Sequence, residues 1–166
     1  ITFNNNENLN NLIKDFSLIH GYNSQGKGGA VNIEHASPTL KGINMSFNAN
    51  SNNGHASGIT IFNGNDDNSV SLENIKIYEN DGDAGFYCFG ANVNIKHLVS
   101  FDNGQNELVV SNCEVNIDKS TIVGNIFGPY NSGCNCGKET KVDISNSILN
   151  SYDGYNNYNP NYCHQI

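Results

Sequence analysis

The sequence predicts an all-β protein, folded as a parallel β-solenoid of about six coils. Three observations lead to this fold class. Apolar residues alternate with polar ones as they do in half-buried strands, and one motif returns along most of the chain. The composition is also poor in helix formers, because only 14% of the 166 residues are charged and Asn, Ser and Gly replace Lys and Glu.

The stretch Gly28–Asn50 contains the motif in its most complete form. Val31 and Ile33 alternate with a polar residue and predict a strand with one buried face. A turn follows at residues 35–38, where Pro38 prevents a helix from continuing. The second strand carries the apolar residues Leu40, Ile43 and Met45, and Asn48 closes the unit. Such a unit cannot bury its own inward face, so we expect it to stack on neighbouring copies.

The second half of this motif recurs along the chain. Its first apolar residue falls at Ile13, Leu40, Leu72, Ile95, Ile117 and Ile144, at intervals of 27, 32, 23, 22 and 27 residues. The irregular spacing indicates insertions in loops between intact strands. We therefore expect these residues to lie one above another in a single column. The asparagines that close four copies, Asn48, Asn80, Asn103 and Asn125, should form a ladder of side-chain amides from coil to coil.

The other elements follow in chain order. Ile1–Phe3 alternates like the end of a strand, Ile13–Ile19 is the first clear strand, and residues 21–27 form a turn. Strands that match the first half of the motif recur at Gly58–Ile61, Gly85–Cys88 and Leu108–Val110. Insertions are expected at 50–57, 63–68 and 127–138. Because the periodicity stops after Leu149, we predict one solenoid domain over residues 1–151 and a non-periodic tail or cap over 152–166.

The charge of the chain excludes one class of partner. The formal net charge is −8, the eight basic residues are all Lys, and they are scattered. Because contacts to nucleic-acid phosphates need clustered Lys or Arg, no nucleic-acid partner is expected. No run of about 18 apolar residues occurs, so no membrane span is expected either.

Several phrases of the sequence resemble those of a known family. GGAVNIEHASPTLKGINMSFNAN looks like the repeat of right-handed parallel β-helix proteins of the pectate-lyase-like superfamily. Their opening phrase is similar to residues 1–3, 12–18 and 21–29, and their late phrase is similar to Asn146–Asn150. The resemblance covers the chain from Ile1 to about Ser151. It implies a single-stranded right-handed parallel β-helix from a bacterial secreted or cell-surface protein, with structural, adhesive or carbohydrate-associated roles.

The resemblance also raises the question of catalysis. Polysaccharide lyases of the superfamily use Ca²⁺ and a basic residue, commonly Arg, and this chain has only lysines; the candidates Lys76, Lys96, Lys119 and Lys141 fall on four different coils. Glycoside hydrolases of the fold use paired carboxylates. Asp102 and Asp118 are single residues on neighbouring coils, and Asp81 and Asp83 belong to a turn. We therefore predict no catalytic residues, with polysaccharide cleavage kept as an alternative.

Two segments have the residue types of metal sites. Asn63, Asn65 and Asp67 alternate like the start of a Ca²⁺ loop, but the acidic residue that closes an EF-hand loop is missing, and an ordinary long turn is the alternative. Cys134, Cys136, Cys163 and His164 could bind zinc, although their spacing is unlike that of common zinc sites. We expect no cofactor, with Ca²⁺ at the first segment as the exception.

The five cysteines indicate an oxidising compartment only if some of them pair. Our preferred pairing joins Cys163 to Cys134 or Cys136 and ties the tail to the last coil; free thiols are the alternative. Cys88 falls in the inward register of its strand and is interpreted as a small buried apolar residue. Cys113 follows at a corner.

Tyrosines are concentrated near the C-terminus, at Tyr130, Tyr152, Tyr155, Tyr158 and Tyr162. Tyr beside amide side chains suits contact with sugars or with a wet interface. The alternative is that these rings cap the open end of the solenoid.

The first hypothesis for function is a non-catalytic structural or adhesive β-helix segment, located outside the cell or on its surface. A carbohydrate-binding or polysaccharide-cleaving β-helix is the alternative, with glycans as partners. A fibre subunit that assembles end to end through its exposed strand edges is the second alternative, with neighbouring coils or subunits as partners.

Overall fold

The structure, a computed structural model, describes residues 1–24, 27–51, 55–62, 69–127 and 140–150. Within these ranges the chain is all-β, and its strands pair in parallel. The same ranges contain no helix with the length and apolar character needed to cross a membrane.

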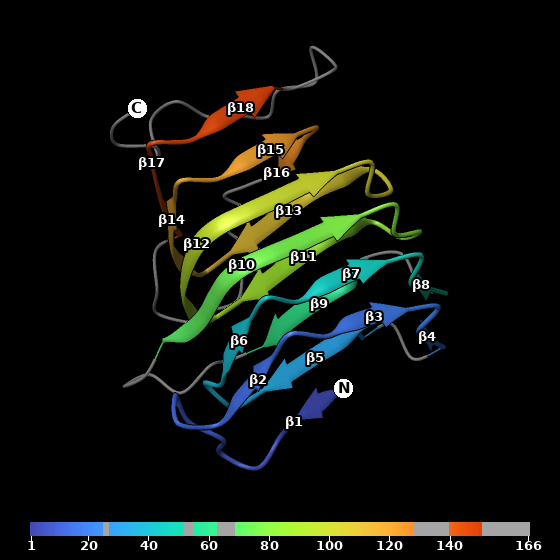
Figure 1. Cartoon of the computed structure of the whole chain (residues 1–166), viewed down its shortest axis with the longest axis vertical. Coiled ribbons are helices and arrows are strands. Elements are labelled where there is room, and N and C mark those ends of the chain that lie inside the picture. The colour runs from blue at the N-terminus through green and yellow to red at the C-terminus, as the bar shows by residue number, and fades with distance from the viewer. Residues whose placement is uncertain (25–26, 52–54, 63–68, 128–139, 151–166) are drawn as a thin grey trace.

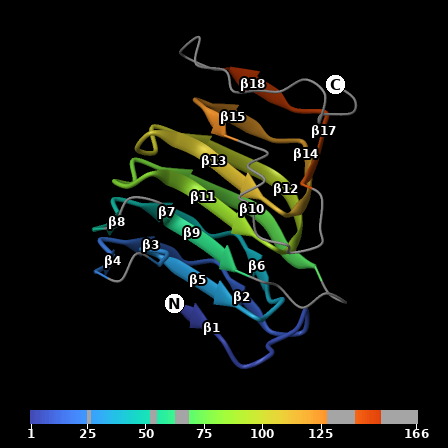
Figure 2. The same ribbon diagram turned by 180° about the vertical axis from the view of Figure 1, so that it is seen from behind.

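Two parallel sheets make up most of the molecule and lie one behind the other (Figures 1 and 2). Sheet A contains, in spatial order, β1 (Thr2–Phe3), β5 (Val31–Glu34), β9 (Ala56–Phe62), β11 (Ala84–Phe89), β13 (Asn106–Ser111) and β16 (Ile126–Phe127). The main path of sheet B contains β2 (Leu12–Lys14), β6 (Thr39–Lys41), β10 (Val70–Tyr78), β12 (Asn92–Phe101), β14 (Glu114–Asp118) and β17 (Lys141–Ser145).

Four further strands of sheet B continue beyond this path: β3 (Ser17–Ile19), β7 (Asn44–Ser46), β15 (Thr121–Val123) and β18 (Ile148–Asn150). A small third sheet pairs β4 (Tyr22–Asn23) with β8 (Ala49–Asn50). Along the sequence the chain passes repeatedly from a strand of sheet A to strands of sheet B and back. We call one such passage a repeat.

The apolar column predicted from the sequence is confirmed. In the register of sheet B, Ile13 pairs with Leu40, and the series continues through Leu72, Ile95, Ile117 and Ile144. The four middle members are at most 2% exposed. Full burial of such a side chain contributes roughly 1.5–3 kcal/mol relative to exposure, so this column is a principal part of the core.

Sheet A supplies the facing half of the core. One inward column runs Val31, Ile59, Phe86 and Leu108, in register across four adjacent strands, and all four side chains are buried. Burial of one face specifies the register of a sheet, and the repeated motif presents the same apolar face from each successive strand. The core therefore lies between the two sheets.

A residue with positive φ bends sheet B once in every repeat. The position is occupied by Asp15, Gly42, Asn74, His97, Lys119 and Asn146, with φ between 50° and 63°. In a regular strand, side chains alternate between the two faces, so residues three positions apart point to opposite faces. The left-handed residue shifts this alternation by one position, and Leu72 and Ile75 therefore both face the core. The predicted continuous strand Ile13–Ile19 is wrong: in this repeat the ladder is interrupted at residues 15–16 and gives two strands, β2 and β3, whereas β10 and β12 continue through the equivalent residues Asn74 and His97.

Candidate functional site

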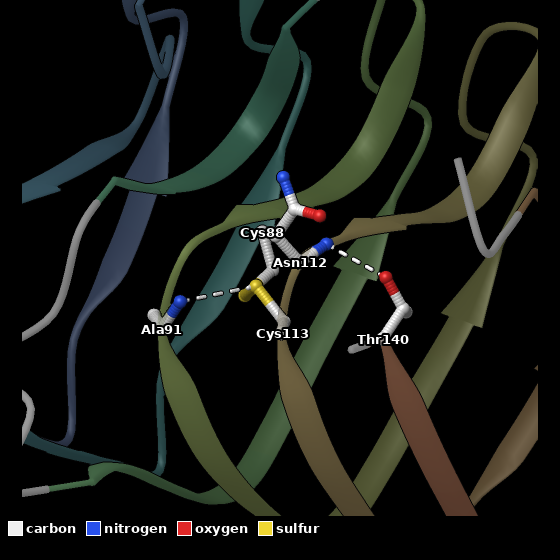
Figure 3. The surroundings of a disulfide bond; sticks show 5 residues. All are labelled: Cys88, Ala91, Asn112, Cys113 and Thr140. Atoms are coloured by element: carbon white, nitrogen blue, oxygen red, sulfur yellow. Dashed lines mark hydrogen bonds between the residues drawn. A yellow bond between two sulfur atoms is a disulfide. The ribbon is translucent and has the colours of Figure 1, made fainter. Parts of the chain in front are cut away.

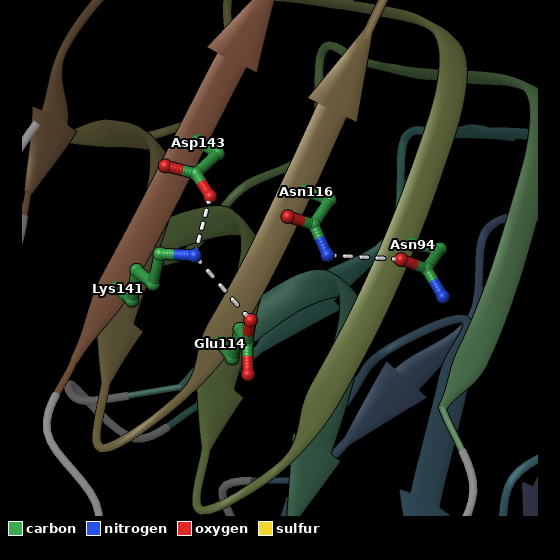
Figure 4. Close-up of polar contacts among 5 residues, drawn as sticks. All are labelled: Asn94, Glu114, Asn116, Lys141 and Asp143. Atoms are coloured by element: carbon green, nitrogen blue, oxygen red, sulfur yellow. Dashed lines mark hydrogen bonds and ion pairs between the residues drawn. The ribbon is translucent and has the colours of Figure 1, made fainter. Parts of the chain in front are cut away.

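A groove of about 400 Å³ lies on the outer face of sheet B. It crosses the adjacent strands β10, β12, β14 and β17. The polar residues that line it are Ser71, Glu73, Asn94, Lys96, Asn116, Asp118, Asp143 and Ser145. Part of this surface is drawn in Figure 4, where three neighbouring strands present their polar side chains together.

Strand register places these residues in two columns. Ser71, Asn94, Asn116 and Asp143 are in register, and so are Glu73, Lys96, Asp118 and Ser145. Between the two columns runs the inward column of Leu72 and its partners. Because side chains alternate between the two faces of a strand, burial of that apolar column forces both polar columns outward.

The first column is connected by direct contacts (Figure 4). Asn116 Nδ2 donates a hydrogen bond to Asn94 Oδ1 at 3.1 Å. At the rim, Lys141 Nζ lies 2.7 Å from Asp143 Oδ2 and 3.6 Å from Glu114 Oε1. The groove therefore offers both amide groups and charged groups on neighbouring strands.

The second column carries alternating charges. Glu73 Oε2 lies 3.0 Å from Lys41 Nζ, on the strand before it. Asp118 Oδ1 accepts hydrogen bonds from Asn146 Nδ2 at 2.8 Å and from Ser145 Oγ at 3.1 Å. Lys96 lies in register between Glu73 and Asp118.

These contacts shift the pKa values of three groups at the groove. The hydrogen bond from Lys41 is the main reason why the pKa of Glu73 is lowered, and the hydrogen bond from Asn146 is the main reason why that of Asp118 is lowered. Asp143 raises the pKa of Lys141. A general acid needs a raised carboxyl pKa and a lysine base needs a lowered one, so all three shifts are opposite to what proton transfer at neutral pH requires.

Hydrogen bonds between side chains join Asn48, Asn80 and Asn103 across successive repeats. Asn48 Nδ2 donates to Asn80 Oδ1 at 2.9 Å, and Asn80 Nδ2 donates to Asn103 Oδ1 at 2.8 Å. All three side chains are at most 2% exposed. The amides lie at a corner of each repeat and satisfy main-chain carbonyls there as well, as when Asn80 Nδ2 donates to the carbonyl of Met45.

The series continues differently after Asn103. Asn103 donates from Nδ2 to Glu107 Oε2 at 2.6 Å and from its main-chain N to Oε1 at 3.2 Å. Asn125, expected as the fourth member, lies directly before β16, and its carbonyl accepts hydrogen bonds from the main-chain N of Glu107 and Leu108. The turn in this repeat is shorter, because β13 begins three residues after Asn103 whereas β16 begins immediately after Asn125.

Sequence reasoning missed Glu107. Its side chain is 3% exposed, and Ser100 Oγ donates to Oε2 at 2.5 Å. Burial is the main cause that raises the pKa of this carboxyl. A smaller cavity of about 190 Å³, lined by Asp102, Glu107 and Gly124 among others, adjoins it. The sequence contains one signal of this buried carboxyl. Ser100 occupies an inward position that is Ile77 in the preceding repeat and Ile122 in the following one, so a polar partner is needed there.

Cys88 and Cys113 form a disulfide between successive repeats (Figure 3). Both are fully buried, their Cα atoms are 6.4 Å apart, and Cys113 Sγ accepts a hydrogen bond from the main-chain N of Ala91 at 3.3 Å. The interpretation of Cys88 as an unpaired apolar residue is therefore wrong, although its burial is confirmed. The signal that could have found the pair is its separation of 25 residues, close to one repeat.

Several predicted site residues lie outside the described residues. They are the cysteines Cys134, Cys136 and Cys163, the tyrosines Tyr130, Tyr152, Tyr155, Tyr158 and Tyr162, and the segment with Asn63, Asn65 and Asp67. Across the part of the chain that the structure describes, no group of three or more His, Cys, Asp or Glu side chains is placed to hold a metal ion.

An aromatic stack runs along the other half of sheet B. The rings of Tyr78 and Phe101 are stacked with centroids 5.2 Å apart, and Phe47 contacts both Tyr78 and His20. Tyr78 and Phe101 face one another, whereas Phe47 meets Tyr78 edge-on, and both arrangements stabilise the neighbouring repeats. They do not line the groove.

Comparison of the chain with protein-family models, with curated proteins and with solved structures finds no match.

Proposed function

We propose that this chain is a non-catalytic, adhesive segment of a right-handed, single-stranded parallel β-helix, and that it binds saccharides in the groove of sheet B. The architecture is supported by the in-register apolar column through six repeats and by the repeated passage between two parallel sheets. The right-handed sense rests on the strong preference of parallel crossover connections for that hand.

The observation that carries the binding function is the composition of the groove. Amides, hydroxyls and charges from four adjacent strands line one hollow. With strands about 4.8 Å apart, the groove spans roughly 14 Å across β10 to β17. An extended, hydroxyl-rich ligand that crosses the strands would meet a new set of donors and acceptors at each step, and a short oligosaccharide has this form.

Binding is favoured over cleavage by the protonation states. Hydrolysis of a glycosidic bond requires one carboxyl with a raised pKa beside an ionised one. In the groove the pKa values of Glu73 and Asp118 are lowered, and that of Lys141 is raised. The buried carboxyl with a raised pKa, Glu107, lies at the second cavity and outside the groove lining.

An extracellular or cell-surface location, in bacteria, is part of the proposal. It is supported by the Cys88–Cys113 disulfide, because disulfides persist mainly in oxidising compartments. It also follows from the resemblance of the repeat to secreted β-helix proteins.

The test is a glycan array with the purified chain, followed by calorimetry on each hit. The double variant Asn94→Ala/Asn116→Ala removes two groove amides and should abolish binding. The matched control Asn44→Ala removes an amide from the same sheet at a position outside the groove, and should bind as the parent does. A chain that binds no saccharide, or a double variant that still binds normally, would refute the proposal.

End-to-end assembly is a second candidate function, favoured by exposed apolar side chains in the first repeat. Phe16 is 58% exposed, although the residues at the same position of the next repeats, Ile43 and Ile75, are at most 1% exposed. Another copy could bury this surface. Light scattering during size-exclusion chromatography should then show mass that grows with concentration, and Phe16→Ser should prevent the growth. A chain that stays monomeric at high concentration would exclude this assembly.

A further inference from the structure

We propose that the groove of sheet B prefers saccharides that carry protonated amino groups over uncharged ones, and uncharged ones over acidic ones. The inference rests on the proposed saccharide-binding function of the groove and names the chemical class that it selects.

The charges of the lining give the direction of the preference. Three carboxylates, Glu73, Asp118 and Asp143, line the groove together with one ammonium group, that of Lys96. The lowered pKa values of Glu73 and Asp118 keep both ionised well below neutral pH. The surrounding chain has the same sign, with a formal net charge of −8.

The lysines around the groove, among them Lys119 near Asp118, offset part of this field from outside the lining. Lys41 and Lys141 pair with Glu73 and Asp143 from the rim, and their side chains are 45% and 54% exposed. Ion pairs at this exposure contribute little, because water and salt compete for both partners. A ligand amine can therefore compete for the same carboxylates.

Register brings two of the carboxylates to the same part of the groove. Asn116 is paired with Asp143, and Asp118 with Ser145, so Asp118 and Asp143 are diagonal neighbours on the outward face of adjacent strands. Diagonal neighbours are about 7–8 Å apart, within joint reach of one bound group. An ammonium group near them would be attracted by both carboxylates, and a carboxylate there would be repelled by both.

Lys96 does not reverse the preference. It is flanked in register by Glu73 on one side and Asp118 on the other. An acidic sugar that approached its ammonium group would also approach these carboxylates. The amides of Asn94 and Asn116 are indifferent to ligand charge, so they should contribute equally to all three classes.

The test compares three oligosaccharides of equal length, made of glucosamine, of N-acetylglucosamine and of galacturonate. Calorimetry at about pH 5.5 keeps the groove carboxylates ionised, since ordinary values are near 4. The glucosamine oligomer should bind about 2- to 5-fold more tightly than the N-acetyl oligomer for each carboxylate engaged. High salt should remove this difference, because exposed charges are screened.

Two charge variants locate the effect. Asp143→Asn should weaken the glucosamine oligomer and leave the affinity for the N-acetyl oligomer unchanged. Asp102→Asn removes the same charge at an exposed position outside the groove and should change neither. Equal or tighter binding of the galacturonate oligomer, or equal effects of the two variants, would overturn the charge preference while saccharide binding stands. Failure of all three oligomers to bind would overturn the charge preference, and failure of every saccharide on the glycan array would overturn both proposals.

Discussion

Removal of one amide from the asparagine ladder tests the account of how the repeats are held together. The side chain of Asn80, 2% exposed, accepts hydrogen bonds from the main-chain N and Nδ2 of Asn48, and its own Nδ2 lies within hydrogen-bond distance of the carbonyls of Met45 and Tyr78 and of Asn103 Oδ1. Because Nδ2 carries two hydrogens for these three acceptors, the side chain makes the equivalent of about four full bonds, and about 1 kcal/mol for each gives about 4 kcal/mol. Some partners keep other bonds, so we expect Asn80→Ala to lower the free energy of unfolding by about 2–4 kcal/mol.

The measurement is urea denaturation of the parent and the variant, with stability taken from the midpoint where the slope is unchanged. The matched control is Asn94→Ala, which removes an exposed asparagine with one side-chain bond to Asn116. Exposed substitutions of this kind change stability by about 0.5 kcal/mol or less. If the two variants unfold at the same midpoint, the ladder does not contribute to stability as argued here.

Three further predictions concern other features of the fold. Burial raises the pKa of Glu107, so its stabilising contribution is present below the ordinary glutamate pKa of about 4.3 and is lost as pH rises through the folded-state pKa. Over that rise, Glu107→Gln should gain stability relative to the parent. Denaturation midpoints of the two proteins that change in parallel across pH would contradict this. The Cys88–Cys113 disulfide joins residues 25 positions apart, and by loop entropy its removal should lower the free energy of unfolding by about 3.5 kcal/mol. The measurement is the denaturation midpoint of Cys88→Ala/Cys113→Ala against that of the parent. An unchanged midpoint would show that the bond is not formed. Lys119 is exposed with φ of 51°, a conformation that a β-branched side chain adopts only at a steric cost. Lys119→Val should therefore lower the free energy of unfolding by about 1–2 kcal/mol, and the control Lys119→Asn should not. Equal melting temperatures of the two variants would argue against the left-handed bend.

Much of the sheet architecture could be predicted because it depends on local pattern. The alternation at Val31 and Ile33 and the recurrence from Ile13 to Ile144 define which faces are apolar, and a parallel register that stacks like residues follows from burying them. The bend at positions such as Lys119 was harder to see. Four of the six residues at this position are Gly, Asn or Asp, the types that adopt the left-handed conformation most readily, but the same types are frequent throughout this chain, so the clearest sequence signal is the three-residue step between Leu72 and Ile75.

The groove could not be predicted as a unit. Glu73, Lys96 and Asp118 are separated by 23 and 22 residues, and each alone is an ordinary outward-facing residue. Only the register places them on adjacent strands, and it is chiefly the contacts with Lys41 and Asn146 that lower the pKa values of Glu73 and Asp118.

The sequence by itself determined the all-β class, the repeat and the inward column, because hydrophobic periodicity is encoded residue by residue along each strand. The tertiary structure decided the partners across repeats: the disulfide between Cys88 and Cys113, the diversion of the ladder from Asn125 to Glu107, and the charge pattern of the groove. These depend on turn lengths between strands, since a turn shortened by a few residues moves Asn125 into the strand pairing and leaves the place beside Asn103 to a buried carboxyl.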